Sequence, residues 1–91
     1  MPKIAIVAAA LVGVLGMPTA QAGSLGRPCT FAPQSRWLTL DALKAKAEAE
    51  GFRVQKAKLK AACGEIYVLD PSGARTELFV DPTSGEIVAR Q

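Results

Sequence analysis

The stretch YVLDPSGARTELFVDPTSGEIV, residues Tyr67–Val88, decides the fold of this 91-residue chain. In and around it, three β-rich runs at 65–69, 75–80 and 86–89 alternate with two segments that begin with Asp-Pro and soon reach a glycine. Aspartate, proline and glycine are residues that tight turns favour. The stretch therefore predicts an antiparallel meander of short strands.

We interpret the two Asp-Pro segments as structural turns, not as ligand loops. The predicted turn residues are Asp70, Pro71, Gly73, Asp81, Pro82 and Gly85. In the first turn, aspartate, proline and glycine occupy the first, second and fourth places of a type I turn, and the second turn is one residue longer. A calcium loop would need several oxygen ligands at alternating positions, whereas each turn offers one carboxylate before a proline.

A helix is predicted before the strands, over LDALKAKAEAE, residues 40–50. Thr39 can cap its first turn, and Gly51 suits the left-handed position after its end. The predicted buried face consists of Leu40, Leu43 and Ala47, which follow helical spacing. After Gly51 the apolar period becomes that of a strand, with Phe52 and Val54 on one face. A register shift before Ala57 and Leu59 predicts a β-bulge.

The fold class that follows is α+β: one amphipathic helix packed on a three- to four-stranded antiparallel β-meander, preceded by an extended disulfide-tethered arm. A small isolated sheet needs another element packed on it, and the helix would cover one face. The residues predicted to face the helix are Ile66, Val68, Leu78, Val80 and one of Ile87 or Val88.

Three segments organise the chain: a signal peptide at 1–22, an extended N-terminal arm at 23–38 and a domain at 39–91. Lys3, the apolar run 4–15 and the Ala-Gln-Ala sequence ending at Ala22 are typical of a secretory signal. The apolar run is too short to span a bilayer, so we expect no transmembrane segment in the mature chain. Cleavage near Ala22 would release a periplasmic or extracellular protein.

The two cysteines, Cys29 and Cys63, predict a structural disulfide, because exported proteins mature in an oxidising compartment. A chain this short also gains from such a link, since its core is small. The alternative is a redox-active or metal-binding thiol pair. The chain contains no histidine and no Cys-x-x-Cys spacing, both of which count against this alternative.

A cluster of positive charges interrupts an otherwise mixed surface. It consists of Arg53, Lys56, Lys58 and Lys60. Such a run is usually a solvated strand face that discourages edge-to-edge aggregation. The functional alternative is binding of anionic lipid or polysaccharide at the cell envelope. Nucleic acid is a poor candidate, because no aromatic residues that could stack on bases are interleaved with these charges.

The sequence predicts a protein that is not an enzyme, with no catalytic residues, no metal site and no cofactor. Without histidine, neither a Ser-His nor a Cys-His pair can form. Glu65 and Glu77 could share one sheet face, where paired carboxylates more often form a solvated charge ladder than an acid–base pair.

The better candidate for a binding surface is the sheet face turned away from the helix. The predicted partner-binding patch consists of Tyr67, Leu69, Phe79, Glu65 and Glu77, because exposed aromatics beside charges suit protein contacts. The alternative is that the arm folds back and that Phe31 and Trp37 cover these side chains. A free sheet edge that accepts an extended peptide is a further possibility.

The segments GFRV (51–54), EIYV (65–68) and GARTELFVDPTSGEI (73–87), placed after an amphipathic helix, resemble a PepSY domain. The resemblance covers about residues 40–88. It implies a helix packed on an antiparallel sheet and a non-catalytic module that modulates peptidases or serves as an interaction domain at the envelope. No peptidase follows in this chain, so any inhibition would act in trans. The arm that carries Cys29 is an addition to the pattern.

Overall fold

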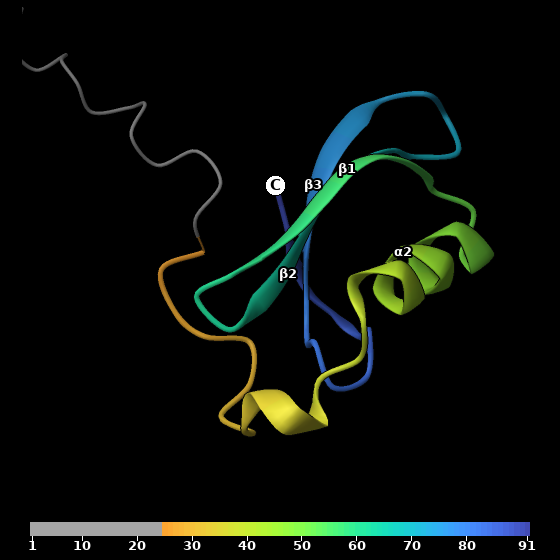
Figure 1. The fold of residues 1–91 in the computed structure, drawn as a ribbon. Helices are drawn as coiled ribbons and strands as arrows, with labels where there is room; N and C mark the ends of the chain where they lie inside the picture. The colour runs from red at the N-terminus through yellow and green to blue at the C-terminus, as the bar shows by residue number, and fades with distance from the viewer. Residues whose placement is uncertain (1–24) are drawn as a thin grey trace, which may run out of the picture.

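The computed structural model describes residues 25–91, and the predicted signal peptide lies outside them. One α-helix packs against a four-stranded antiparallel sheet whose strand order follows the chain (Figure 1). The elements are η2 (Gln34–Arg36), α2 (Leu40–Ala49), β1 (Arg53–Lys60), β2 (Cys63–Leu69), β3 (Arg75–Val80) and β4 (Ile87–Arg90). The predicted α+β fold, a helix on an antiparallel meander, is confirmed.

Helix α2 begins and ends where its local signals indicate. The Thr39 hydroxyl oxygen accepts a hydrogen bond from the Ala42 N–H at 3.1 Å, which satisfies one of the free donors of the first turn. At the other end Gly51 has a φ of +98°, a conformation that residues with a Cβ rarely adopt. Leu43 and Ala47 are buried against the sheet.

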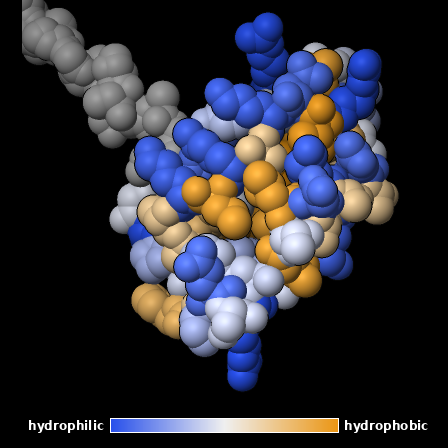
Figure 2. All heavy atoms as spheres, viewed as in Figure 1, coloured by the Kyte–Doolittle hydropathy of each residue, from blue (hydrophilic) through white to orange (hydrophobic). Residues whose placement is uncertain are grey.

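The helix covers the sheet face that carries the hydrophobic core. The core cluster consists of Leu43, Ala47, Phe52, Ile66, Val68, Leu78 and Val80. Val54, Ala57 and Ile87 pack against its edge, so Ile87 is the last-strand residue that faces the helix. The pairing of β1 with β2 shifts register between Val54 and Lys56, which confirms the expected bulge. Figure 2 shows hydrophobic side chains along β1 and between β1 and α2, bordered by hydrophilic ones.

The two Asp-Pro segments close the β2–β3 and β3–β4 hairpins. Asp70 Oδ1 accepts bonds from the Ser72 N–H at 2.9 Å and the Ala74 N–H at 2.9 Å. Asp81 Oδ1 likewise accepts from the N–H of Thr83 at 2.8 Å and from its hydroxyl at 2.7 Å. Each aspartate therefore uses its carboxylate to hold its own turn, as short polar side chains commonly do.

The hairpin between β1 and β2 has a turn that the sequence did not indicate. Lys60 pairs with Cys63, which leaves a two-residue loop of Ala61 and Ala62. Both alanines have positive φ, 52° and 64°, where a side chain is disfavoured by about 1–2 kcal/mol per residue. The Ala62 carbonyl accepts a hydrogen bond from the Cys29 N–H at 3.2 Å. This hydrogen bond from the arm thus helps to stabilise the strained Ala61–Ala62 turn.

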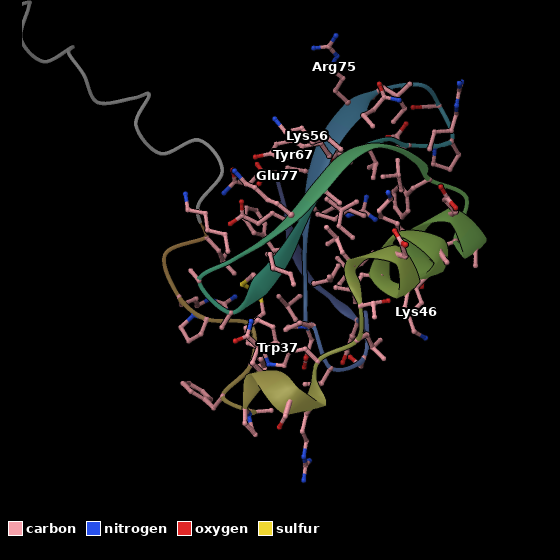
Figure 3. The ribbon with its side chains drawn as sticks, viewed as in Figure 1. Trp37, Lys46, Lys56, Tyr67, Arg75 and Glu77 are labelled. Atoms are coloured by element: carbon pink, nitrogen blue, oxygen red, sulfur yellow. A yellow bond between two sulfur atoms is a disulfide. The ribbon has the colours of Figure 1, made fainter. Side chains whose placement is uncertain are left out.

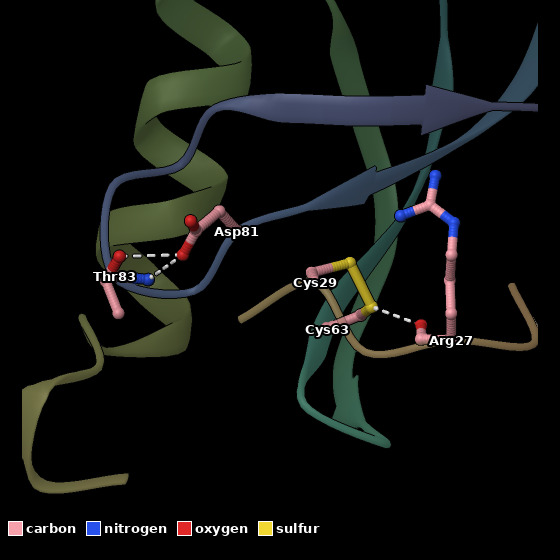
Figure 4. Close-up of a disulfide and its surroundings, with 5 residues drawn as sticks. All are labelled: Arg27, Cys29, Cys63, Asp81 and Thr83. Carbon is pink, nitrogen blue, oxygen red and sulfur yellow. Dashed lines mark hydrogen bonds between the residues drawn. A yellow bond between two sulfur atoms is a disulfide. The ribbon is translucent and has the colours of Figure 1, made fainter. Parts of the chain in front are cut away.

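The N-terminal arm runs from the β1–β2 turn to the β3–β4 turn. A disulfide joins Cys29 to Cys63 at the start of β2, as expected (Figure 4). The Arg27 carbonyl oxygen lies 3.7 Å from Cys63 Sγ, a packing contact because an oxidised sulfur has no hydrogen to donate. Farther along, the Leu38 N–H donates to the Pro82 carbonyl at 2.8 Å. The arm therefore passes around one end of the sheet.

Within residues 25–91, no helix is long and apolar enough to cross a membrane.

Candidate functional site

The sheet face opposite α2, here called the outer face, carries most of the predicted site residues. Antiparallel pairing places Lys58, Glu65 and Phe79 in one row across β1, β2 and β3, and Lys56, Tyr67 and Glu77 in the next. The predicted site residues on this face are Arg53, Lys56, Lys58, Lys60, Glu65, Tyr67, Leu69, Glu77 and Phe79. The two predicted sites, aromatic and basic, thus belong to a single surface.

One end of the outer face is closed, which corrects the predicted exposed patch. Phe79 has an exposed fraction of 0% and Glu65 of 1%, although neither faces the helix. The disulfide holds the arm on this side at Cys63, and the arm continues toward Pro82 past the row that contains both residues. Phe79 and Glu65 are therefore internal residues beneath the arm, and a partner cannot contact them there. Glu77 is also largely buried, so the expected solvated carboxylate ladder does not form.

Of the two aromatic residues of the arm that the sequence suggested as a cover, Phe31 is exposed and Trp37 is half-buried. Phe31 is 93% exposed, so it points away from the sheet. Trp37 is half-buried, and its indole N–H donates to the Ala32 carbonyl at 3.1 Å within the arm itself. Phe31 therefore takes no part in closing the outer face, while the disulfide and the backbone hydrogen bonds of the arm hold the arm at this end.

The other end of the outer face remains open and forms a hollow of about 520 Å³. We call it the outer-face hollow; its lining residues are Gln55, Lys56, Tyr67, Val68, Arg75, Thr76, Glu77 and Gln91. Figure 3 shows Lys56, Tyr67 and Glu77 close together on the side of β1 away from α2, with Arg75 at the end of β3. Tyr67 and Leu69 of the predicted patch are half-buried at this end.

Strand β4 contributes a hollow residue that sequence reasoning missed. The Gln91 N–H and carbonyl exchange hydrogen bonds with the Glu77 backbone, both at 2.9 Å, and the Thr76 hydroxyl also donates to the Gln91 carbonyl at 2.9 Å. These bonds hold Gln91 beside the hollow. No local sequence pattern predicts that Gln91 lies beside the hollow, because its place depends on the register of β4 against β3.

The rim of the hollow is positively charged. Lys56 Nζ lies 5.4 Å from the centroid of the Tyr67 ring, within the range of a cation–π contact. Lys58 Nζ is 4.0 Å from Glu65 Oε1, at the limit of an ion pair. On β1, β2 and β3 together, five basic side chains share the outer face with two glutamates. Their positive excess favours anionic groups in a ligand.

Beneath the hollow lies a buried carboxylate, Glu77, one of whose oxygens has no hydrogen-bond partner. Glu77 is 8% exposed, and its Oε2 atom has no hydrogen-bond partner. Burial, and then the charge of Glu65, raise the pKa of Glu77, while the Tyr67 hydroxyl and the charges of Lys58 and Lys60 oppose this rise. Burial, and then Glu77, also raise the pKa of Tyr67. An unsatisfied buried acceptor lowers stability, and this atom lies too deep for a ligand to reach.

Glu77→Gln should stabilise the protein more at neutral pH than in acid. The pKa of Glu77 in the folded protein lies above its ordinary value of 4.5, so protonation of Glu77 stabilises the fold. This stabilisation is complete below pH 4.5 and is lost as pH rises through the folded pKa. Glutamine, which is always neutral, keeps it at neutral pH. Urea unfolding of both proteins at pH 4 and pH 7 measures the difference. Glu65→Gln removes the charge that is the second cause of the raised pKa of Glu77. In a Glu65→Gln background, the effect of Glu77→Gln should therefore differ less between pH 4 and pH 7, but it should still differ. A Glu77→Gln effect that is the same at both pH values would contradict this assignment.

The arrangement is suited to binding. Within residues 25–91, no three metal-ligating side chains of histidine, cysteine, aspartate or glutamate come together. Both cysteines are in the disulfide, which accounts for the only two thiols of the chain. The hollow offers two cationic side chains, Lys56 and Arg75, and the aromatic ring of Tyr67.

A helix packed on a four-stranded antiparallel meander, with one end of the outer face open, is the architecture that residues 25–91 define. The family model described as peptidase propeptide and YPEB domain matches residues 4–91. The chain therefore belongs to this family, the PepSY family, and the match extends beyond the segment in which the resemblance was first recognised. No curated protein and no solved structure matches the chain. Membership indicates a regulatory module of the peptidase-propeptide type, and the disulfide fits an oxidising compartment.

Proposed function

We propose that this protein is an exported, non-catalytic PepSY module that binds another protein and modulates a peptidase in trans. Family membership supports the regulatory role, and the signal-like N-terminus together with the disulfide supports a periplasmic or extracellular location. The absence of histidine from the sequence supports a role without nucleophilic catalysis.

The observation that carries this proposal is the uneven covering of the outer face. The arm closes the end that contains Phe79, while the end that contains Lys56 and Tyr67 stays open. A partner would therefore contact the hollow and its basic rim. Tyrosine and arginine are enriched among residues that dominate protein contacts, and Tyr67 and Arg75 supply both.

The purified, disulfide-bonded protein should slow hydrolysis of casein by the peptidases that its host secretes, and the effect should grow with its concentration. The double variant Lys56→Glu/Arg75→Glu, which reverses the charge of the rim, should require about tenfold more protein for the same inhibition. Lys46→Ala changes an exposed cation on α2, away from the hollow, and serves as the control. Unchanged hydrolysis at every concentration would refute the proposal, as would release of peptides from casein by the protein alone.

A second candidate function is binding of anionic lipid or polysaccharide by the basic strand. It is favoured by one observation: Arg53, Lys56, Lys58 and Lys60 all lie on the outer face of β1, at the edge of the sheet. Such binding would depend on the number of charges and would weaken steeply as salt rises. In such binding, loss of any one of the four cations should weaken affinity by a similar amount, whereas binding of a protein at the hollow should depend mainly on Lys56.

A further inference from the structure

We propose that residues 29–33 of the arm, here called the Phe31 loop, enter the active-site cleft of an endopeptidase and place the Phe31 ring in a specificity pocket that accepts aromatic residues. The inference rests on the proposed function and deepens it, because it names the segment that meets the peptidase and the kind of peptidase that fits. Three observations carry it: an exposed ring, free backbone groups beside it, and restraints on both of its sides. The loop shares no residue with the outer-face hollow.

Phe31 presents almost its whole side chain to solvent. Its exposed fraction is 93%, whereas the other two phenylalanines, Phe52 and Phe79, are buried. Figure 1 shows the arm, in orange, at the periphery of the molecule beside the β1–β2 turn, where a partner can approach it. Aromatic rings buried in apolar pockets dominate many protein contacts. A single exposed apolar residue is common, so the backbone around Phe31 decides what this ring can do.

The backbone at Phe31 is free to pair with another chain. Within residues 25–91, neither the N–H nor the carbonyl of Thr30 or Phe31 forms a hydrogen bond. Neither residue lies in a helix or a strand. A peptidase cleft binds its substrate as an extended segment, through backbone hydrogen bonds of the kind that add a strand to a sheet edge. The free groups beside the ring match this requirement, and an anionic lipid or polysaccharide has no use for them.

The disulfide anchors the loop on the N-terminal side of the ring. It ties Cys29, two residues before Phe31, to the start of β2. The Cys29 N–H also donates to the Ala62 carbonyl at 3.2 Å. The position of the loop is therefore set by the sheet.

Hydrogen bonds restrain the residue that follows the ring. The Ala32 N–H donates to the Thr30 hydroxyl oxygen at 3.1 Å. The Ala32 carbonyl accepts from the Trp37 indole N–H at 3.1 Å. Pro33 further limits Ala32 to extended conformations, because a proline disfavours the helical region for the residue before it. Both backbone groups of Ala32 are thus engaged, while those of Phe31 are free.

These restraints favour an inhibitor over a substrate. A loop that is already held in an extended form loses little entropy when it binds, so it binds more tightly than a flexible segment of the same sequence. Hydrolysis between Phe31 and Ala32 would leave the two pieces joined through the disulfide and would not release them. The loop can therefore occupy a cleft for much longer than an ordinary substrate.

The test measures inhibition of chymotrypsin and of trypsin by the disulfide-bonded protein, with small chromogenic substrates. The specificity pocket of chymotrypsin is a hydrophobic slot, whereas that of trypsin contains an aspartate that selects lysine and arginine. The protein should inhibit chymotrypsin and leave trypsin unaffected. Phe31→Lys should reverse this preference. Full chymotrypsin activity at every concentration of the wild-type protein would overturn the inference.

Matched variants test whether the ring itself makes the contact. Phe31→Ala should raise the inhibition constant for chymotrypsin about 100-fold, and Phe31→Tyr should change it less than about threefold. Leu59→Ala removes another exposed apolar side chain, outside the loop, and should change it less than about twofold. Unfolding curves should coincide for all four proteins, because both sites are exposed. Equal inhibition by wild-type protein and Phe31→Ala would rule the loop out.

A further variant tests the restraint on Ala32. Trp37→Phe keeps an aromatic ring but removes the indole N–H that holds the Ala32 carbonyl. Mass spectrometry under reducing conditions should show that chymotrypsin cuts this variant between Phe31 and Ala32 faster than it cuts the wild-type protein. Cleavage of the wild-type loop at the rate of a linear peptide of residues 27–35 would show that the loop is a substrate and overturn the inference.

The outcome is separable from that of the casein assay. Inhibition of the host peptidases that is unchanged in Phe31→Ala would leave the regulatory function standing and remove only the assignment of the loop. Inhibition of chymotrypsin that depends on Phe31, without any effect on the host peptidases, would support the loop and remove those peptidases as its target.

Discussion

Replacement of both cysteines, Cys29→Ser/Cys63→Ser, should lower the free energy of unfolding by about 4 kcal/mol. The disulfide closes a loop of 34 residues, and its loss restores the corresponding freedom to the unfolded chain. The effect is large for a domain of this size, because small domains have only marginal stability. Urea unfolding of the oxidised protein and of the double variant measures the difference.

The arm gives this experiment a second measurement. Trp37 is the only tryptophan and lies in the arm, half-buried. If the disulfide holds the arm on the outer face, the double variant should show a red shift of tryptophan emission before global unfolding. Wild-type protein treated with a reductant should behave like the double variant. Unchanged stability in both would show that the other contacts of the arm are sufficient without the link.

Phe79→Ala should destabilise the protein by about 3–5 kcal/mol, although the residue lies on the face opposite the helix. The Phe79 side chain is fully buried, so truncation removes its packing contacts and leaves a cavity beneath the arm. The variant should also loosen the arm, because Glu65 lies opposite Phe79 in the pairing of β2 with β3 and shares its cover. Thermal and urea unfolding with the disulfide intact provide the measurement.

Phe31→Ala is the matched control, since it makes the same chemical change in the same arm-and-sheet region. Phe31 is almost wholly exposed, and surface substitutions usually change stability by less than about 0.5 kcal/mol. The two phenylalanines should therefore differ by several kcal/mol. A small effect at Phe79 would mean that the arm does not cover the outer face in solution.

For the partner-binding patch, the sequence predicted which face of the sheet each residue occupies but not whether the residue is exposed. Alternation along β2 and β3 correctly placed Tyr67 and Phe79 on one face, because strand side chains alternate with a period of two. It could not assign their exposure, which depends on a segment roughly 40 residues away in the sequence. The basic residues of β1 and the aromatic residues of β2 likewise formed two separate predictions until register joined them in one surface.

The same limit applies to Glu77. A glutamate in a strand usually faces water, and nothing in the local sequence distinguishes Glu77 from the exposed Glu86. Its burial follows from the neighbouring strands, with Tyr67 on one side and the backbone pairing of Gln91 on the other. Only the assembled sheet reveals an acceptor without a donor.

Local chemistry alone determined the helix, the strands and the two Asp-Pro corners. Thr39, Gly51, Asp70 and Asp81 act on backbone groups within a few residues, and the apolar periods of α2 and the strands identify the core face. Tertiary structure decided the rest: the strained Ala61–Ala62 turn, the buried outer end and the open hollow. These depend on where the arm runs, and its course is set by a disulfide and hydrogen bonds between segments distant in sequence, which no local pattern encodes.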